Sequence, residues 1–347
     1  LAWVGANHVF CAPQDAHIHA IAARQPSSAL VARVIAGGDP RQRKGPTAGL
    51  KIDLCVRHSS TRRFSGEQQL TNMSIRGVSL YVEVVGNGYP LVLMHGGPGS
   101  DHTTMSPFQA CADRFTLVFY DHRCNGRSEG ADLSSMTWDN LTADAEALRQ
   151  ALGFDKWAVL GHSFGGMVAL EYALRYPQSL SHLLLLDTCG DTWWVRHNAP
   201  ELLAKRGFRP ATVETARRFY TGEIERDDYL PAMLRLARAF YYRLSPLVLA
   251  RDMAMGLRIK SRPDAFIFAA RHLLEGWTVM DRLGEIQVPT LVLAGRDDFQ
   301  FPPEHQADLA AGISHARLEI IERAGHNAPT ERSAEVIKAV KNFLSDT

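Results

Sequence analysis

The sequence predicts an α/β fold, with a mostly parallel sheet of eight strands and helices on both faces. Short apolar stretches typical of strands alternate with stretches of helical periodicity through most of residues 74–345. One gap between strand patterns, at about 190–285, is far longer than a usual connection with a single helix. Its helical patterns predict a helical segment inserted after the sixth strand.

The eight strands are expected at about 74–77, 79–85, 91–94, 116–120, 157–161, 182–187, 290–294 and 317–321. Helical patterns lie between or after them at 137–152, 166–176 and 333–344. The first of these has one apolar stripe, which predicts a face turned toward the core. Within the inserted segment, helices are expected at 211–220, 228–240, 246–255 and 263–274.

Residues 1–72 differ from the rest of the chain, because they are rich in Ala, Arg, Gly and Ser and show no sustained periodicity. They offer no amphipathic face long enough to offset the conformational entropy lost on ordering. We therefore expect 1–72 to be a poorly ordered extension that adds no strand to the sheet. It is either a segment upstream of a start at Met73 or a basic transit peptide. The expected domains are then a core of 73–189 and 286–347 and the inserted segment 190–285.

The composition is that of an ordinary globular protein, with 46% hydrophobic residues, 22% charged residues and a net charge of +1. This charge gives no reason to expect nucleic acid or a membrane surface as a partner. No apolar run approaches the ~18–20 residues of a membrane span. The five cysteines show no paired spacing and no Cys/His cluster, so we expect no metal, no other cofactor and a reducing, cytoplasmic compartment. The oligomeric state is left open.

The pentapeptide at 161–165, Gly-His-Ser-Phe-Gly, lies directly between a strand pattern and a helical pattern. A serine can be lifted clear of a sheet edge only by a very tight turn, and glycines two residues before and after it leave room for that turn. The context therefore predicts Ser163 as a nucleophile.

A serine hydroxyl needs a base to remove its proton, and the base needs an acid to orient it. His326 follows the last strand pattern and is the expected base. The acid is expected in the loop after the seventh strand, with Asp298 preferred over Asp297; Asp187, at the end of the sixth strand, is a third possibility. Loops at the carboxyl ends of strands are where open α/β sheets place their chemistry.

The glycine-rich loop at 95–99, His-Gly-Gly-Pro-Gly, follows the third strand. Glycines let a backbone approach a substrate closely, so its N–H groups can face the negative charge that develops during acyl transfer. We expect the N–H groups of Gly97 and Phe164 to form this oxyanion hole, and His95 to brace the loop.

With these motifs in order, the chain resembles the α/β-hydrolase superfamily over roughly residues 74 to 345. The loop at 95–99 and the sequence Asp-His-Arg-Cys-Asn-Gly-Arg-Ser at 121–128 resemble the proline iminopeptidase-like (S33) branch, although Cys124 stands where glycine is usual. The Gly-His-Ser-Phe-Gly-Gly run at 161–166 is instead similar to carboxylesterases, lactonases and carbon–carbon bond hydrolases. The resemblance implies that Asp298 is the acid and that 190–285 is a cap over the active site.

The resemblance further implies a serine hydrolase that acts through an acyl-enzyme on small carboxylic esters. The alternatives are a proline iminopeptidase acting on short peptides and a lactone or carbon–carbon bond hydrolase. An iminopeptidase needs a carboxylate near the cap for the substrate amine, for which Glu201, Glu223, Glu225 and Glu275 are available. A non-catalytic receptor on the same fold is disfavoured, because binding alone does not need an intact serine, histidine and acid.

Overall fold

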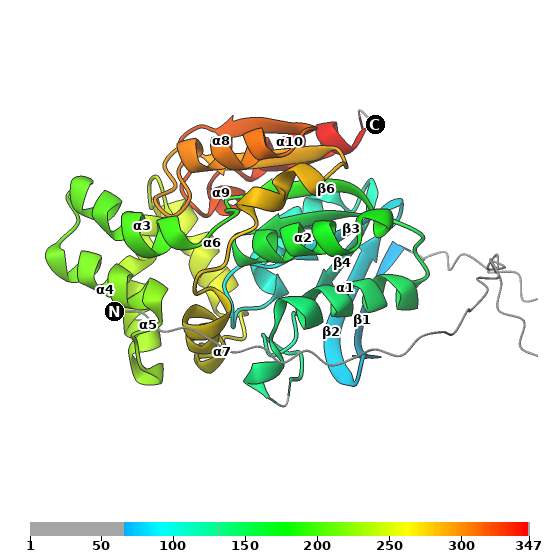
Figure 1. The fold of residues 1–347 in the computed structure, drawn as a ribbon, viewed down its shortest axis with the longest axis horizontal. Helices are drawn as coiled ribbons and strands as arrows, with labels where there is room; N and C mark the ends of the chain where they lie inside the picture. The colour runs from blue at the N-terminus through cyan, green and yellow to red at the C-terminus, as the bar shows by residue number, and fades with distance from the viewer. Residues whose placement is uncertain (1–65, 131, 346–347) are drawn as a thin grey trace, which may run out of the picture. The chain divides into compact units, whose positions relative to one another are not determined.

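The computed structural model describes residues 66–130 and 132–345, and they form an eight-stranded sheet with helices around it (Figure 1). The strands are β1 (Gly66–Ile75), β2 (Val78–Gly86), β3 (Tyr89–Met94), β4 (Phe115–Tyr120), β5 (Trp157–His162), β6 (Leu180–Leu186), β7 (Thr290–Gly295) and β8 (Ala316–Ile321). Their order across the sheet is β1-β2-β4-β3-β5-β6-β7-β8. β2 pairs antiparallel with β1 and β4, and the pairs from β4 through β8 are parallel. The predicted fold class is confirmed.

The sheet separates two hydrophobic cores. In β5, Val159 belongs to one core, whereas Ala158 and Leu160 belong to the other. Helices α1 (Trp138–Leu152) and α2 (Phe164–Arg175) contribute to the first core, and α10 (Ser333–Ser345) and the 3₁₀ segment His102–Cys111 contribute to the second. Because both faces are covered, every residue of β4, β5 and β7 is buried.

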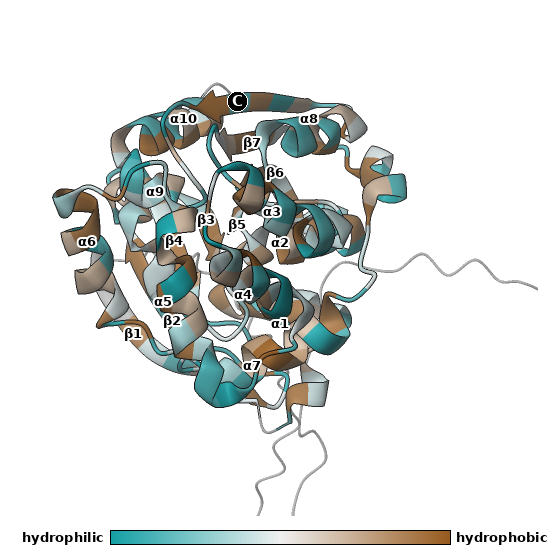
Figure 2. Ribbon diagram, turned by 90° about the vertical axis from the view of Figure 1, so that its left-hand side faces the viewer, coloured by the Kyte–Doolittle hydropathy of each residue, from teal (hydrophilic) through white to brown (hydrophobic). Residues whose placement is uncertain are grey.

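A helical insertion, residues 190–285, connects β6 to β7. It contains α3 (Trp193–Lys205), α4 (Pro210–Thr221), α5 (Tyr229–Leu236), α6 (Pro246–Gly256) and α7 (Pro263–Phe268). The stretches predicted as helices at 228–240 and 263–274 end in a 3₁₀ turn (Ala237–Phe240) and a π turn (Ala269–Leu273). Helix α6 is mostly brown, that is apolar, in Figure 2, and its Leu247 and Met253 are exposed.

The insertion is tied to the core through Trp277. Its indole Nε1 donates a hydrogen bond to Glu171 Oε1 on α2 at 2.7 Å, and its ring lies 5.0 Å from the Trp138 ring. The insertion is therefore anchored beside the helix that follows Ser163.

Strand β1 begins at Gly66, so the prediction that 1–72 adds no strand to the sheet is wrong for residues 66–72. Gln69, Leu70, Thr71 and Asn72 pair with residues 81–84 of β2. β1 is an edge strand whose Leu70, Thr71 and Asn72 are exposed, so backbone pairing alone holds this part and no apolar alternation marks it in the sequence. Residues 1–65 lie outside the described residues, so the rest of that prediction remains untested.

Three α-helices of the described residues were not expected from the sequence: α3, α8 (Pro303–Gly312) and the short α9 (Ala328–Glu331). Helix α9 follows the loop that carries His326. Within the described ranges, no helix is both long enough and apolar enough to cross a membrane.

Candidate active site

Ser163 lies in the turn between β5 and α2 with φ +55° and ψ −121°, a conformation that non-glycine residues rarely adopt. A Cβ atom on Gly161 would overlap with the carbonyl oxygen of Gly165, and one on Gly165 would overlap with that of Met94. The two glycines are therefore required by close approach of the backbone. Thr188 Oγ1 donates to the Ser163 carbonyl at 2.7 Å and helps to hold the turn.

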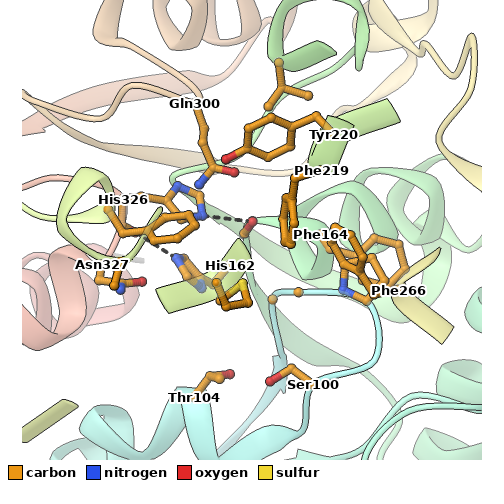
Figure 3. A pocket seen from close by; sticks show the side chains of 18 of the residues that line it. Ser100, Thr104, His162, Phe164, Phe219, Tyr220, Phe266, Gln300, His326 and Asn327 are labelled. Atoms are coloured by element: carbon orange, nitrogen blue, oxygen red, sulfur yellow. Dashed lines mark hydrogen bonds between the residues drawn. The ribbon is translucent and has the colours of Figure 1, made fainter. Parts of the chain in front are cut away.

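The structure brings Ser163, His326 and Asp298 into one chain of hydrogen bonds (Figure 3). His326 Nε2 lies 3.0 Å from Ser163 Oγ, and His326 Nδ1 lies 2.8 Å from Asp298 Oδ2. The other carboxylate oxygen of Asp298, Oδ1, accepts a hydrogen bond from the Gln300 N–H at 2.8 Å, and Asp298 is 0% exposed. Asp298 follows β7 and His326 follows β8, which are neighbours in the sheet.

The two alternative acids occupy other positions. The carbonyl of Asp297 accepts from Arg206 Nη1 at 2.7 Å, and its N–H donates to the carbonyl of Ala324. Asp187 Oδ1 accepts from the Gly295 N–H at 2.7 Å. Burial and the negative charge of Asp298 raise the pKa of Asp187 well above its usual value, which favours the neutral form of this acid.

The glycine-rich loop packs against the serine turn. A Cβ atom on Gly96 would lie 2.9 Å from His162 Nδ1 and 3.1 Å from Ser163 Cβ, and Gly97 has φ +60°. Gly97 and Phe164 both line the cavity beside Ser163. Their N–H groups make no hydrogen bond to the described residues, so both donors are free for a ligand.

The loop at 121–128 supports the glycine-rich loop at 95–99. Asp121 accepts hydrogen bonds from the backbone N–H groups of His102 and Arg127, at 2.8 and 2.7 Å. His95 Nε2 accepts from the His122 N–H at 3.1 Å, and Asn125 Oδ1 accepts from the Gly99 N–H. These contacts give 121–128 a structural function. Cys124 has φ +63°, a left-handed backbone that glycine adopts without strain, and this explains why glycine is usual there.

His162 is a supporting residue that sequence reasoning missed. Its Nε2 donates to the His326 carbonyl at 3.1 Å, and the two rings lie 5.1 Å apart. Burial and the neighbouring His326 lower its pKa to about 3, so the ring is neutral and braces the backbone of His326. The only sequence feature that could have indicated this role is its position directly before Ser163 in the pentapeptide. That position accepts any residue type, so the motif did not single it out.

A cavity of about 410 Å³ opens in front of Ser163, between the core and the helical insertion. Its wall is mostly apolar and includes Phe164, Phe219, Met233, Phe240, Phe266 and Phe301. Tyr241, also from the helical insertion, lies in the wall as well.

The acidic residue of the wall is Asp252 on α6. None of the four glutamates considered from the sequence, Glu201, Glu223, Glu225 and Glu275, lines this cavity. Glu201, for example, pairs with Arg217 at 2.9 Å on the surface. The suggestion that one of the four binds a substrate amine is therefore not supported by their positions.

Comparisons with known proteins agree with this architecture. Over 284 residues the chain is 29% identical to a proline iminopeptidase of Saccharolobus solfataricus, covering 78% of this chain and 90% of the relative. It is 26% identical over 300 residues to a 2-hydroxy-6-oxo-6-phenylhexa-2,4-dienoate hydrolase of Burkholderia cepacia, covering 83% and 98%. A thermophilic esterase from Thermogutta terrifontis superposes with a TM-score of 0.64 at 25% identity, covering 80% of this chain and 98% of the esterase.

These relatives differ in the reaction that their names describe. What they share is a fold, and a family model described as alpha/beta hydrolase fold matches residues 89–333. That range contains the strands β3 to β8, the serine turn, both loops and the helical insertion. The chain therefore belongs to the α/β-hydrolase fold family.

Proposed function

We propose that this protein is a serine hydrolase that cleaves small carboxylic esters through an acyl-enzyme. The observation that carries the proposal is the hydrogen-bonded chain from Asp298 through His326 to Ser163, which ends at a largely apolar cavity. An apolar wall with few charges suits an uncharged ester. The esterase of Thermogutta terrifontis supports the same reaction class.

In the proposed mechanism, His326 Nε2 takes the proton of Ser163 Oγ as this oxygen attacks the ester carbonyl carbon. Asp298 holds the proton on His326 Nδ1, so Nε2 is free to accept. The N–H groups of Gly97 and Phe164 stabilise the negative oxygen of the tetrahedral intermediate. His326 then gives its proton to the leaving alcohol, and water repeats the sequence to release the acid. The helical insertion acts as a cap that shields these steps.

A proline iminopeptidase is the second candidate, supported by the relative from Saccharolobus solfataricus. The same groups would perform the chemistry, and Asp252 would be the acid available in the cavity wall for the substrate amine. The relative from Burkholderia cepacia supports carbon–carbon bond hydrolysis as a further alternative. Lactone hydrolysis is the remaining alternative for the same groups.

Hydrolysis rates for a series of p-nitrophenyl acyl esters and for proline p-nitroanilide discriminate between these functions. We expect kcat/KM to be higher for the esters. A higher value for the anilide would overturn the ester assignment and favour the iminopeptidase.

Covalent labelling by a fluorophosphonate tests the nucleophile. Ser163→Ala should abolish labelling and lower turnover by several orders of magnitude, as removal of a triad serine generally does. Ser74→Ala, which changes an exposed serine on β1, is the matched control and should label normally. Labelling that persists in Ser163→Ala would refute the assignment of the nucleophile.

A further inference from the structure

Two polar side chains in the cavity wall have unused hydrogen-bonding groups beside the serine and histidine. They are Gln300, two residues after Asp298, and Tyr220, at the end of α4. The nitrogen Nε2 of Gln300 and the hydroxyl oxygen of Tyr220 are buried, and neither has a hydrogen-bond partner among the described residues. In Figure 3 the Gln300 carboxamide and the Tyr220 hydroxyl point toward one another next to the His326 ring.

Both side chains are held in place by the surrounding structure. The Gln300 N–H donates to Asp298 Oδ1 at 2.8 Å, and Gln300 is only 6% exposed. The Tyr220 ring lies 6.3 Å from the Phe299 ring and 5.5 Å from the Phe219 ring. Arg196 Nη1 donates to the Tyr220 carbonyl at 3.2 Å. Two buried polar groups kept without partners are unusual in a folded protein, and a ligand that bonds to them explains their presence.

The chemistry of the two groups selects the ligand. Burial and the negative charge of Asp298 raise the pKa of Tyr220 well above its usual value, so its hydroxyl keeps its proton and can donate. The Gln300 amide nitrogen is also a donor. Two donors without partners in the same wall select a ligand that carries an oxygen acceptor. An ammonium group cannot accept a hydrogen bond, and a carboxylate would be repelled by the charge of the nearby Asp298.

We propose that Gln300 and Tyr220 form a subsite that binds a neutral ether, hydroxyl or carbonyl oxygen on the alcohol part of the substrate. This inference rests on the proposed function, in which His326 delivers its proton to the leaving alcohol. The alcohol therefore lies on the His326 side of the cavity, where Figure 3 places Gln300 and Tyr220. Ser100 and Thr104 lie at the other end in that view.

Two esters of nearly equal size test the subsite. Butyl butyrate and 2-methoxyethyl butyrate have the same number of non-hydrogen atoms, but the second carries an ether oxygen in its alcohol. For each ester, kcat/KM is divided by the rate of its alkaline hydrolysis to correct for intrinsic reactivity. The corrected value for the wild-type protein should be about tenfold higher for 2-methoxyethyl butyrate than for butyl butyrate, as one added hydrogen bond gives. Tyr220→Phe and Gln300→Met should each remove most of this preference. Because each variant is measured on both esters, a general loss of folded protein cancels from the ratio.

Ser100→Ala is the matched control, since it removes a hydroxyl from the far end of the cavity and should leave the ratio unchanged. Butyl methoxyacetate, with its ether oxygen in the acyl part, should show no preference that depends on Tyr220 or Gln300. Equal wild-type rates for the two butyrates would overturn the subsite, as would a preference that both variants retain. A preference confined to the acyl ether would overturn its assignment to the alcohol.

Binding of the two butyrates to the Ser163→Ala protein separates the subsite from the proposed function, because this variant should not hydrolyse them. Dissociation constants from saturation-transfer NMR should favour the ether ester, and Tyr220→Phe in the Ser163→Ala background should remove this preference. Absence of hydrolysis by the wild-type protein together with a Tyr220-dependent binding preference would refute the esterase and support the subsite. Hydrolysis of both esters without any binding preference would refute the subsite and leave the esterase standing.

Discussion

The hydrogen bond between Asp298 and His326 provides the sharpest test of the proposed chemistry. Asp298→Asn preserves the size of a side chain that is 0% exposed and keeps an oxygen for the Gln300 N–H. In the wild-type structure His326 Nδ1 lies 2.8 Å from Asp298 Oδ2. The asparagine can place its NH₂ group at that position. The histidine must then carry its proton on Nε2, which faces Ser163 Oγ and can no longer accept from it. We expect kcat to fall about 10⁴-fold, which raises the barrier by about 5.5 kcal/mol.

The same substitution at Asp187 is the matched control, because Asp187 is also fully buried and close to Asp298. The raised pKa of Asp187 favours its neutral acid form, and asparagine has nearly the same shape and charge as that form. Its amide oxygen can still accept from the Gly295 N–H, which donates to Asp187 Oδ1 at 2.7 Å. Asp187→Asn should therefore change kcat little.

Steady-state hydrolysis of p-nitrophenyl butyrate, with thermal unfolding of each variant, completes the comparison. Unfolding curves establish that both variants are folded, so that a rate difference reports on the histidine. If Asp187→Asn loses as much activity as Asp298→Asn, or Asp298→Asn loses less than about tenfold, the assignment of the acid is refuted.

Three further predictions concern stability. Burial disfavours the charged form of His102, but its hydrogen bonds to Asp121 and Glu83 outweigh burial and raise its pKa from 6.5 to about 9. This stabilisation is fully present below about pH 6.5 and is lost as pH rises through 9. The free energy of unfolding should therefore fall by up to about 3 kcal/mol over that range. The fall should be smaller in the His102→Gln variant. A chain beginning at Met73 loses the β1–β2 pairs formed by residues 69–72, and urea unfolding should show it about 1–3 kcal/mol less stable than a chain beginning at Gly66. Equal midpoints would show that this part of β1 adds nothing. Trp277→Phe removes the hydrogen bond to Glu171 and should lower stability by about 1–2 kcal/mol in the same assay, whereas Trp193→Phe, at an exposed site, should not.

The strands could be predicted from the sequence because most of them are buried on both faces. A strand such as β4 or β7 is mostly apolar along its whole length, and such runs end where the chain leaves the core. The predicted and observed bounds of β5 differ by a single residue. β1 lacks this signal in residues 66–72; at this edge of the sheet its backbone is paired, and the side chains of Leu70, Thr71 and Asn72 are exposed.

The arrangement of Ser163, Asp298 and His326 could also be anticipated, because each follows a parallel strand and parallel strands end at one edge of a sheet. β7 and β8 pair directly, so the loops that carry Asp298 and His326 are brought together by the sheet itself. Position in the chain and position in the fold are therefore closely linked for these three residues.

Position in the chain does not predict in the same way which residues line the cavity. These residues come mostly from helices whose mutual packing is decided by many weak apolar contacts. A helical pattern in the sequence indicates which face is buried, but it does not say which other element that face meets. From the sequence, four glutamates of the insertion looked equally suitable for binding a substrate amine. In the structure, Asp252 on α6 is the acid that lines the cavity.

Tyr220 and Gln300 illustrate this most clearly. Tyr220 ends a helix of the insertion and Gln300 lies in the loop after β7, and what joins them is the packing of the Tyr220 ring near the Phe299 ring. Each residue alone is an ordinary polar position in the sequence. Their hydrogen-bonding groups become informative only when both are buried beside His326 without partners. In the proposed function, the serine, histidine and acid define the reaction class, and the contacts between the insertion and the core define the substrate. Experiments on substrate choice should therefore begin at that boundary.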